Sequence, residues 1–238
     1  MVSMSRCLCL LIVLFGCNYI CSAEPLAGTK RLDWEGDIAS RLIDSADAFL
    51  LKKIEETLAK NELDQPDRAE LARILGVVDK RVAASSHLEV LSKVAESDDF
   101  VVHEIRWEAF GDVYGEGLWL APPNAKESII VIPDADQTPE EIAGFDDKLP
   151  MVYQTAREYA AGGLNVFVPV LINRNLGPHK ISNREYLYRP AFELGRHLIG
   201  YEIQKVLALV DRLGAELVGI HGHGEGGMLA LFSAAIDD

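Results

Sequence analysis

The 238-residue sequence predicts an α/β fold, in which a mostly parallel sheet carries helices on both faces and a small helical segment precedes it. Apolar residues recur at spacings of three and four between residues 38 and 78, where no glycine occurs before Gly76. After residue 101, short apolar runs and helical stretches alternate. Their order is strand, helix, strand, helix, strand, turn and helix, as expected of parallel strands joined by helical crossovers.

Residues 1–23 have the layout of a secretory signal peptide. Arg6 precedes the apolar run CLCLLIVLFGC, which is too short to span a bilayer, and small residues end the segment at Ala23. We expect cleavage near Ala23 and an exported protein, periplasmic or extracellular. An uncleaved anchor, or a lipid on Cys17, is the alternative. Because all four cysteines lie in this leader, the mature chain is expected to contain no thiol: Cys7, Cys9, Cys17 and Cys21.

The formal net charge of -14 bears on possible partners. Nucleic acids and anionic membranes attract basic surfaces, so neither is expected to be a partner of so acidic a chain. No spanning segment is expected in the mature protein. Its length suits either one large domain or a domain with a small helical attachment.

Residues 24–85 are expected to form the N-terminal helical segment. Pro66, with Asp64 before it, divides the helical pattern into two helices. The apolar positions of the first are Leu42, Ile43, Ala46, Phe49, Leu50, Ile54 and Leu58.

Residues 86–238 are expected to form a partial α/β domain. Alternation and β-branched residues predict strands in VVHEIRWEAF, GLWLAPP and ESIIVIPDADQ, with glycine and proline turns between them. A helix is predicted over residues 150–161, ended by two glycines, and the apolar strand NVFVPVLI follows. The longest predicted helix covers residues 183–213, and LVGI is the next strand.

The turn HGHGEGG after LVGI is compatible with three kinds of site. Gly222, Gly224 and Gly227 match the dinucleotide-binding pattern G-x-G-x-x-G. The acidic ribose partner, about 20 residues further on, would lie beyond the last residue, which argues against this hypothesis. His221 and His223 offer two metal ligands where zinc needs three or four, so no metal site is expected.

The third kind of site is a nucleophile elbow, G-x-S-x-G, which aligns with residues 222–226. Small residues are needed there because the central position is strained at a sharp turn. On this pattern GHGEGGMLALFSAA resembles the α/β-hydrolase superfamily, and within it the dienelactone hydrolase and acetyl xylan esterase-like members. The resemblance covers roughly residues 101–238.

This resemblance implies an incomplete α/β-hydrolase-type sheet, because the sequence ends at Asp238, before the strands that carry the acid and the histidine of the family. It also implies acyl transfer from a carboxylic ester to water, with no cofactor. A small ester or carbohydrate ester is the substrate expected of a full-length relative.

Gly224 stands where the family has its nucleophile, and it has no side chain that could attack a carbonyl. The resemblance assigns the backbone N–H of Glu225 to the oxyanion hole, and a carboxylate also suits a helix start. A direct chemical role of Glu225 or His223 is the less favoured hypothesis. The sequence thus predicts an esterase-like chain that is inactive as written, and the alternative is a non-catalytic binding or interaction protein on the same fold.

The loop PDADQ, after strand SIIVI, is where such hydrolases place the second oxyanion donor. The backbone N–H of Ala135 or Asp136, or the amide of Gln137, is a candidate. The favoured alternative is that Asp136 or Thr138 simply caps the helix that follows.

A polar, basic patch follows strand NVFVPVLI. It either lines an anion pocket at the same sheet edge or forms a solvated loop, and the loop is the favoured interpretation. Its members are Asn173, Arg174, Asn175, His179 and Arg184.

Overall fold

The computed structural model describes residues 27–30, 35–59, 67–82, 88–145, 148–178 and 180–237. The expected signal peptide and its four cysteines lie outside the described residues. The chain divides into two compact units, Met1–Glu62 and Leu63–Asp238. In the described ranges, no helix has both the length and the apolar character needed to cross a bilayer.

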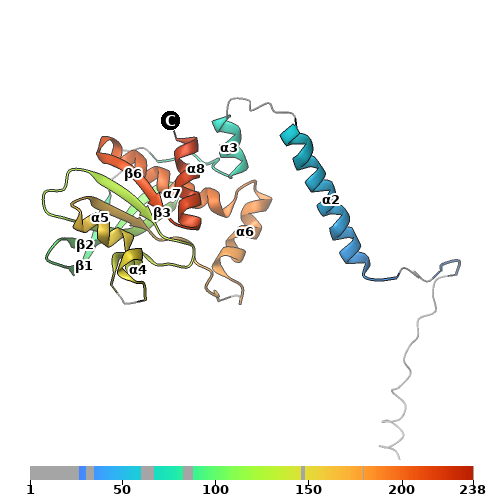
Figure 1. The fold of residues 1–238 in the computed structure, drawn as a ribbon, viewed down its shortest axis with the longest axis horizontal. Helices are drawn as coiled ribbons and strands as arrows, with labels where there is room; N and C mark the ends of the chain where they lie inside the picture. The colour runs from blue at the N-terminus through green and yellow to red at the C-terminus, as the bar shows by residue number, and fades with distance from the viewer. Residues whose placement is uncertain are drawn as a thin grey trace, which may run out of the picture. The chain divides into compact units, whose positions relative to one another are not determined.

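The first unit contains one long helix, α2 (Ile38–Ala59; Figure 1). Asp37 precedes it, and its carboxylate accepts hydrogen bonds from the Ala39 N–H, at 2.9 Å, and the Ser40 hydroxyl, at 3.0 Å. The bond from the Ala39 N–H satisfies a backbone donor that the first turn of a helix leaves without an intrahelical partner. The two helices predicted on either side of Pro66 correspond to α2, which ends at Ala59, and to the helix Arg68–Ile74.

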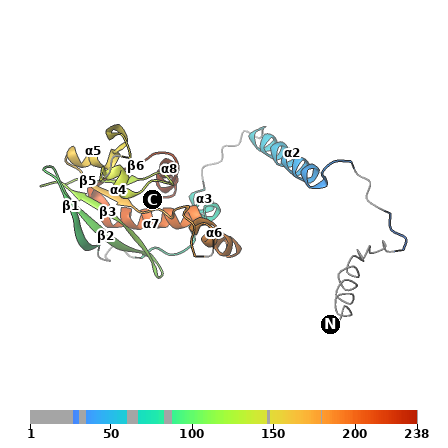
Figure 2. The same ribbon diagram turned by 90° about the horizontal axis from the view of Figure 1, so that it is seen from below.

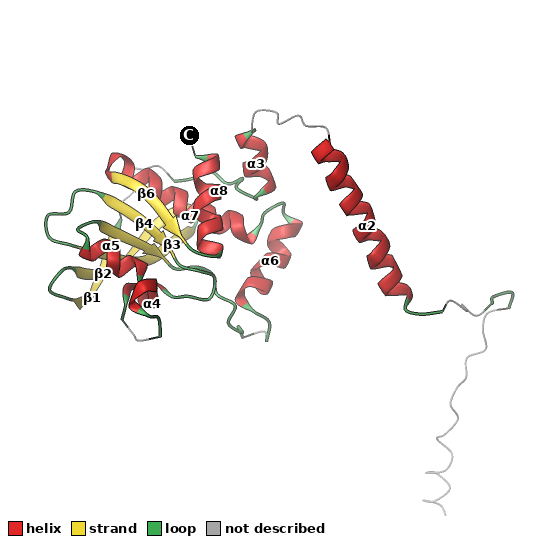
Figure 3. Cartoon of the chain, in the orientation of Figure 1, coloured by secondary structure: helices red, strands yellow, loops and turns green. Residues whose placement is uncertain are grey.

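The second unit is built on a six-stranded sheet in the order β1-β2-β3-β5-β4-β6 (Figure 3). The strands β5, β4 and β6 are parallel, whereas β1, β2, β3 and β5 pair antiparallel. Because β2 and β3 are joined by only two residues, they must run in opposite directions. The bounds are β1 Glu89–Glu96, β2 Val101–Phe110, β3 Val113–Ala121, β4 Ser128–Ile132, β5 Asn165–Pro169 and β6 Leu217–Gly222.

Helices cover both faces of this sheet. One core contains side chains of α7 (Leu198–Leu213) and α8 (Glu225–Ile236), and the other contains side chains of α4 (Pro139–Ala143) and α5 (Thr155–Ala161). Figure 2 shows α7 running along the sheet. This confirms the α/β class with a sheet between two helical layers.

The position of β4, an inner strand between β5 and β6, explains why four of the five residues of SIIVI are apolar. All five of its residues are buried, and they alternate between the two cores: Ile129 and Val131 face α4 and α5, while Ile130 and Ile132 face α7 and α8. A strand covered on both faces needs no polar positions. Each such side chain contributes roughly 1.5–3 kcal/mol by burial.

The second unit begins earlier in the chain than residue 86. Helix α3 (Arg68–Ile74) is capped by the Asp67 carboxylate, and Leu75 belongs to the core that contains α7. The first turn of α7 lies against the backbone that follows α3, since a Cβ atom on Gly200 would lie 2.4 Å from the Leu75 carbonyl oxygen. The segment around α3 is therefore part of the sheet domain.

The single helix predicted over residues 183–213 is wrong, because the chain forms α6 (Asn183–Glu193) and then α7. Gly195 adopts φ +69° between them, and His197 is extended, with its ring Nδ1 accepting the Ile199 N–H at 3.2 Å. Arg196 binds the carboxylate of Asp79. The apolar spacing continues through the break, so periodicity alone does not reveal it.

Replacement of Ile130 by alanine should destabilise the second unit by about 2–5 kcal/mol, because Ile130 is fully buried in the inner strand β4. Urea unfolding followed by circular dichroism measures the loss. Ile74→Ala is the matched control, since Ile74 is 62% exposed and its truncation should cost less than about 1 kcal/mol. Equal losses for the two variants would contradict the described core.

Candidate functional site

The turn between β6 and α8 has the backbone of a sharp strand-to-helix corner. Gly224 lies at its apex with φ +56° and ψ -124°, a conformation that residues with side chains rarely adopt. The apex is exposed, and the turn stands at the carboxyl end of a parallel strand. In open α/β sheets this is the edge where sites are found.

Close packing requires the two flanking glycines. A Cβ atom on Gly222 would lie 2.3 Å from the carbonyl of Gly226, and one on Gly226 would lie 2.4 Å from the carbonyl oxygen of Ile132. No side chain fits at either position without backbone movement. The spacing of glycines in GHGEG therefore follows from the approach of α8 to the ends of β6 and β4.

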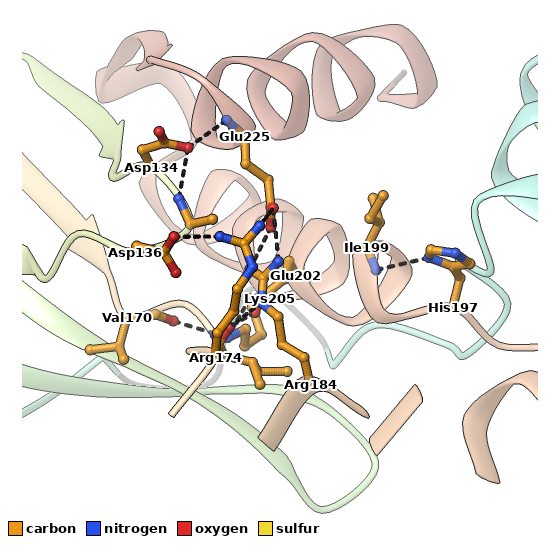
Figure 4. A network of polar contacts seen from close by, with 12 residues as sticks. Asp134, Asp136, Val170, Arg174, Arg184, His197, Ile199, Glu202, Lys205 and Glu225 are labelled. Atoms are coloured by element: carbon orange, nitrogen blue, oxygen red, sulfur yellow. Dashed lines mark hydrogen bonds and ion pairs between the residues drawn. The ribbon is translucent and has the colours of Figure 1, made fainter. Parts of the chain in front are cut away.

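The carboxylate of Asp134 lies at the apex of the corner (Figure 4). Its Oδ1 accepts the backbone N–H of Glu225 at 2.8 Å and that of Ala135 at 2.8 Å. The Glu225 N–H and the Ala135 N–H are two of the candidate oxyanion donors, beside Asp136 and Gln137, and the structure brings these two together on one oxygen. A Cβ atom on Gly224 would lie 2.4–2.5 Å from the atoms of this carboxylate.

Hydrogen bonding stabilises the charged form of Asp134. The Glu225 N–H is the largest cause of a lowered pKa for this carboxyl, and partial burial opposes it. The Ala135 N–H and electrostatic interactions with His223 and Arg174 also lower the pKa. Asp134 is therefore a carboxylate near neutral pH.

The side chain of Glu225 is bound by Arg184. The guanidinium donates to both carboxylate oxygens, at 2.8 and 2.5 Å, and the two side chains are only 13% and 17% exposed. Arg184 also donates from Nε to the carbonyl oxygen of Ile172 at 2.6 Å. The hydrogen bond to Glu225 raises the pKa of Arg184, so the guanidinium keeps its positive charge.

Arg174 reaches the same corner from the loop after β5. It binds the carboxylate of Asp136, and its second Nη lies 3.6 Å from Glu225 Oε2. Asn173 Oδ1 instead accepts the Asn175 N–H and the Asn183 amide, which shapes the loop itself. Two arginines of the predicted basic patch thus lie at the turn, while His179 falls outside the described residues.

A buried ion pair on α7 supports the loop that carries Arg174 (Figure 4). Lys205 Nζ lies 2.6 Å from Glu202 Oε2 and donates to the carbonyl oxygen of Val170 at 3.0 Å. Glu202 Oε1 accepts the Ile172 N–H at 2.7 Å. Both charged groups therefore bind the backbone after β5 and fix its course over α7.

The remaining candidates of the PDADQ loop have structural contacts. Gln137 Oε1 accepts the Asp134 N–H at 3.0 Å, and Asp136 is exposed. Thr138 caps α4 in a capping box with Glu141. The favoured interpretation of a helix cap is confirmed for Thr138, and Ala135 is the residue whose N–H faces the corner.

The two histidines of the turn have different surroundings. His221 Nδ1 lies 3.3 Å from the hydroxyl of Tyr159 on α5, whereas His223 is exposed beside the corner. Within the described ranges, no group of three or more histidine, cysteine, aspartate or glutamate residues could hold a metal ion.

Comparison with known proteins gives structural likeness only. No family model matches the sequence, and no curated protein matches it. A putative acetyl xylan esterase from Bacteroides fragilis is similar in structure, with a TM-score of 0.55, 13% identity and coverage of 71% of this chain. Two other structures are more distant. Acetyl xylan esterase 1 from Thermoanaerobacterium has a TM-score of 0.42 and 14% identity, and the match covers 71% of this chain and 53% of that one. A promiscuous CE15 esterase from a marine bacterial metagenome has a TM-score of 0.43 and 12% identity, and the match covers 71% of this chain and 54% of that one.

The likeness to the Bacteroides fragilis protein, together with the strand order, shows an α/β-hydrolase fold. The chain spans about half of that structure, which it covers to 49%. At this identity the comparison establishes the fold alone. The chemistry of this chain has to be argued from its own residues.

Loss of the Arg184 side chain should destabilise the second unit by about 2–4 kcal/mol, because the carboxylate of Glu225 would remain partly buried without its main partner. Chemical unfolding of Arg184→Ala measures this. Arg189→Ala is the control: Arg189 is 71% exposed and pairs with Glu185 one turn away, so its loss should cost less than about 0.5 kcal/mol. Similar losses of unfolding free energy in the two variants would show that the Arg184–Glu225 ion pair stabilises the fold no more than an exposed ion pair does.

Asp134 should make the unfolding free energy depend on acid pH. Because its pKa is lower in the folded chain than in the unfolded chain, its stabilisation is present above the unfolded pKa and is lost as the pH falls through the folded value. Asp134→Asn should lack this part of the pH profile. Urea unfolding at a series of acid pH values tests it, and parallel profiles of variant and parent would contradict the prediction.

Proposed function

We propose that this chain is an exported, non-catalytic relative of carboxylic-ester hydrolases. The observation that supports the proposal most directly is Gly224 at the apex of the strand-to-helix corner, with φ +56° and ψ -124°. An esterase needs an attacking oxygen at this apex, and glycine has none. The relationship to esterases is supported by the fold of the acetyl xylan esterase that resembles it.

The two backbone N–H donors at the corner also have a hydrogen-bond partner already. Acyl transfer requires two N–H groups that face the oxygen of the scissile carbonyl as negative charge develops. Here the N–H groups of Ala135 and Glu225 both bind the Asp134 carboxylate, whose charge would repel an oxyanion. Such a corner does not stabilise the transition state of ester hydrolysis.

Neither of the other candidate groups replaces the nucleophile. The Glu225 carboxylate is held on both oxygens by Arg184, so it is directed into an ion pair. His223 is exposed, but a base has no hydroxyl to activate at Gly224. A dinucleotide phosphate would meet the Asp134 carboxylate at the same N–H group of Glu225, which argues against that hypothesis.

Export is proposed from the leader in residues 1–23. The ligands that the relationship suggests are small esters or carbohydrate esters, which this chain would bind without cleaving. A binding or interaction protein is therefore the alternative description of the same molecule. Exposed apolar side chains beside a hollow of about 440 Å³ favour it, notably Met151 (72% exposed) and Val152 (71% exposed).

Hydrolysis of p-nitrophenyl acetate tests the proposal. The purified mature chain should release p-nitrophenol no faster than buffer alone, because it lacks an attacking group. His223→Ala and Glu225→Gln should show the same background rate. Turnover well above buffer that disappears in either variant would overturn the non-catalytic assignment, and mass spectrometry of secreted protein that still carries residues 1–23 would overturn the cleaved leader.

A further inference from the structure

We propose that the Asp134 carboxylate is a built-in occupant of the corner after β6 and excludes external anions from its two N–H groups. This carboxylate occupies the position of an ester oxyanion, and another carboxylate or acyl oxygen reaches the two N–H groups only when this side chain leaves. The inference rests on the proposed function, because it takes the corner to be of esterase type.

The contact joins two distant segments of the chain. Ala135 is adjacent to Asp134, whereas Glu225 lies 91 residues further on, in the first turn of α8. Both N–H groups converge on one oxygen, Oδ1, at 2.8 Å. Convergence of two main-chain donors on a single oxygen is the arrangement that stabilises an oxyanion, and here the anion comes from the chain itself.

The carboxylate also fills the space above Gly224. A Cβ atom built there would lie 2.4 Å from Asp134 Oδ1 and 2.5 Å from Cγ and Oδ2. These distances are far below van der Waals contact, so a side chain at position 224 and the present conformation of Asp134 exclude each other. The contact therefore blocks both the oxygen site and the nucleophile site.

The groups around the corner favour the arrangement in which the Asp134 carboxylate binds the two N–H groups. His223 and Arg174 both lower the pKa of Asp134, while Asp136 and Glu225 are neutralised by Arg174 and Arg184. The carboxylate is consequently held as an anion. Its side chain is half-buried at the edge of the sheet, so it can turn outward without disturbance of either core.

Amide proton shifts of the wild-type protein test the contact directly. On acid titration, the amide signals of Ala135 and Glu225 should move together, with one midpoint below the ordinary aspartate value, because both protons are bound to the same carboxylate. Asp134→Asn, which keeps the shape of the side chain, should abolish the transition. Amides that do not titrate, or that titrate with different midpoints, would overturn the proposal.

Acetate binding tests whether the carboxylate blocks the donors. In Asp134→Ala, acetate should shift the Ala135 and Glu225 amides saturably, with an apparent affinity about tenfold or more above that of the wild type. Asp136→Ala is the matched control and should respond as the wild type does. Equal responses of all three proteins would overturn the proposal, and if Asp134→Ala does not fold, the wild-type titration decides.

The stability of paired variants gives an independent measurement. Gly224→Ala should lower the urea midpoint of the parent chain more than that of Asp134→Ala, because the clash with the carboxylate is present only in the parent. Equal shifts of the urea midpoint in the two backgrounds would contradict the steric conflict between Asp134 and a side chain at position 224. Ester turnover by the wild type would refute the proposed function without change to the amide titration, so the two failures are distinguishable.

Discussion

The site depends on the close approach of the first turn of α8 to the end of β4. Gly226 makes the approach possible, since any Cβ atom there would lie 2.4 Å from the Ile132 carbonyl oxygen. Because α8 lies so near, the N–H of Glu225 comes within 2.8 Å of Asp134. The Glu225 side chain then reaches Arg184, which in turn binds the Ile172 carbonyl. The absence of a side chain at Gly226 thus allows three segments to bind one another through hydrogen bonds between charged groups. These segments are the loops after β4 and β5 and the turn after β6.

Much of this arrangement could be predicted from the sequence where the cause is local. The apolar run SIIVI predicts a strand buried on both faces, and the spacing of glycines in GHGEG predicts a sharp turn at the end of a strand. The resemblance to α/β-hydrolases implied the Glu225 N–H as an oxyanion donor and left Ala135, Asp136 and Gln137 as candidates for the second. Parallel strands end at the same sheet edge, so topology alone brings the turns that carry these candidates together.

The parts that could not be predicted are those fixed by tertiary contacts. Asp134 and Glu225 are 91 residues apart, and nothing in PDADQ indicates which carboxylate turns toward the corner. Arg184 was assigned to a polar loop, but it lies in the first turn of α6, and its partner Glu225 is 41 residues further along the chain. The break at Gly195 is hidden by an apolar spacing that runs through it, and His197 caps α7 with a ring nitrogen, which few capping rules anticipate.

Gly224 and Asp134 are best understood as a pair. A residue with a side chain at φ +56° and ψ -124° costs of order 1–3 kcal/mol of backbone strain, which a catalytic corner has to sustain. Glycine removes most of that strain, and the space it leaves accommodates a carboxylate that satisfies two backbone donors. Each residue makes the other favourable, because Asp134 cannot lie there beside a side chain at position 224. A substitution that introduced a hydroxyl at this apex would therefore meet both backbone strain and the negative charge of Asp134, so the present corner is stabilised by the two residues acting together.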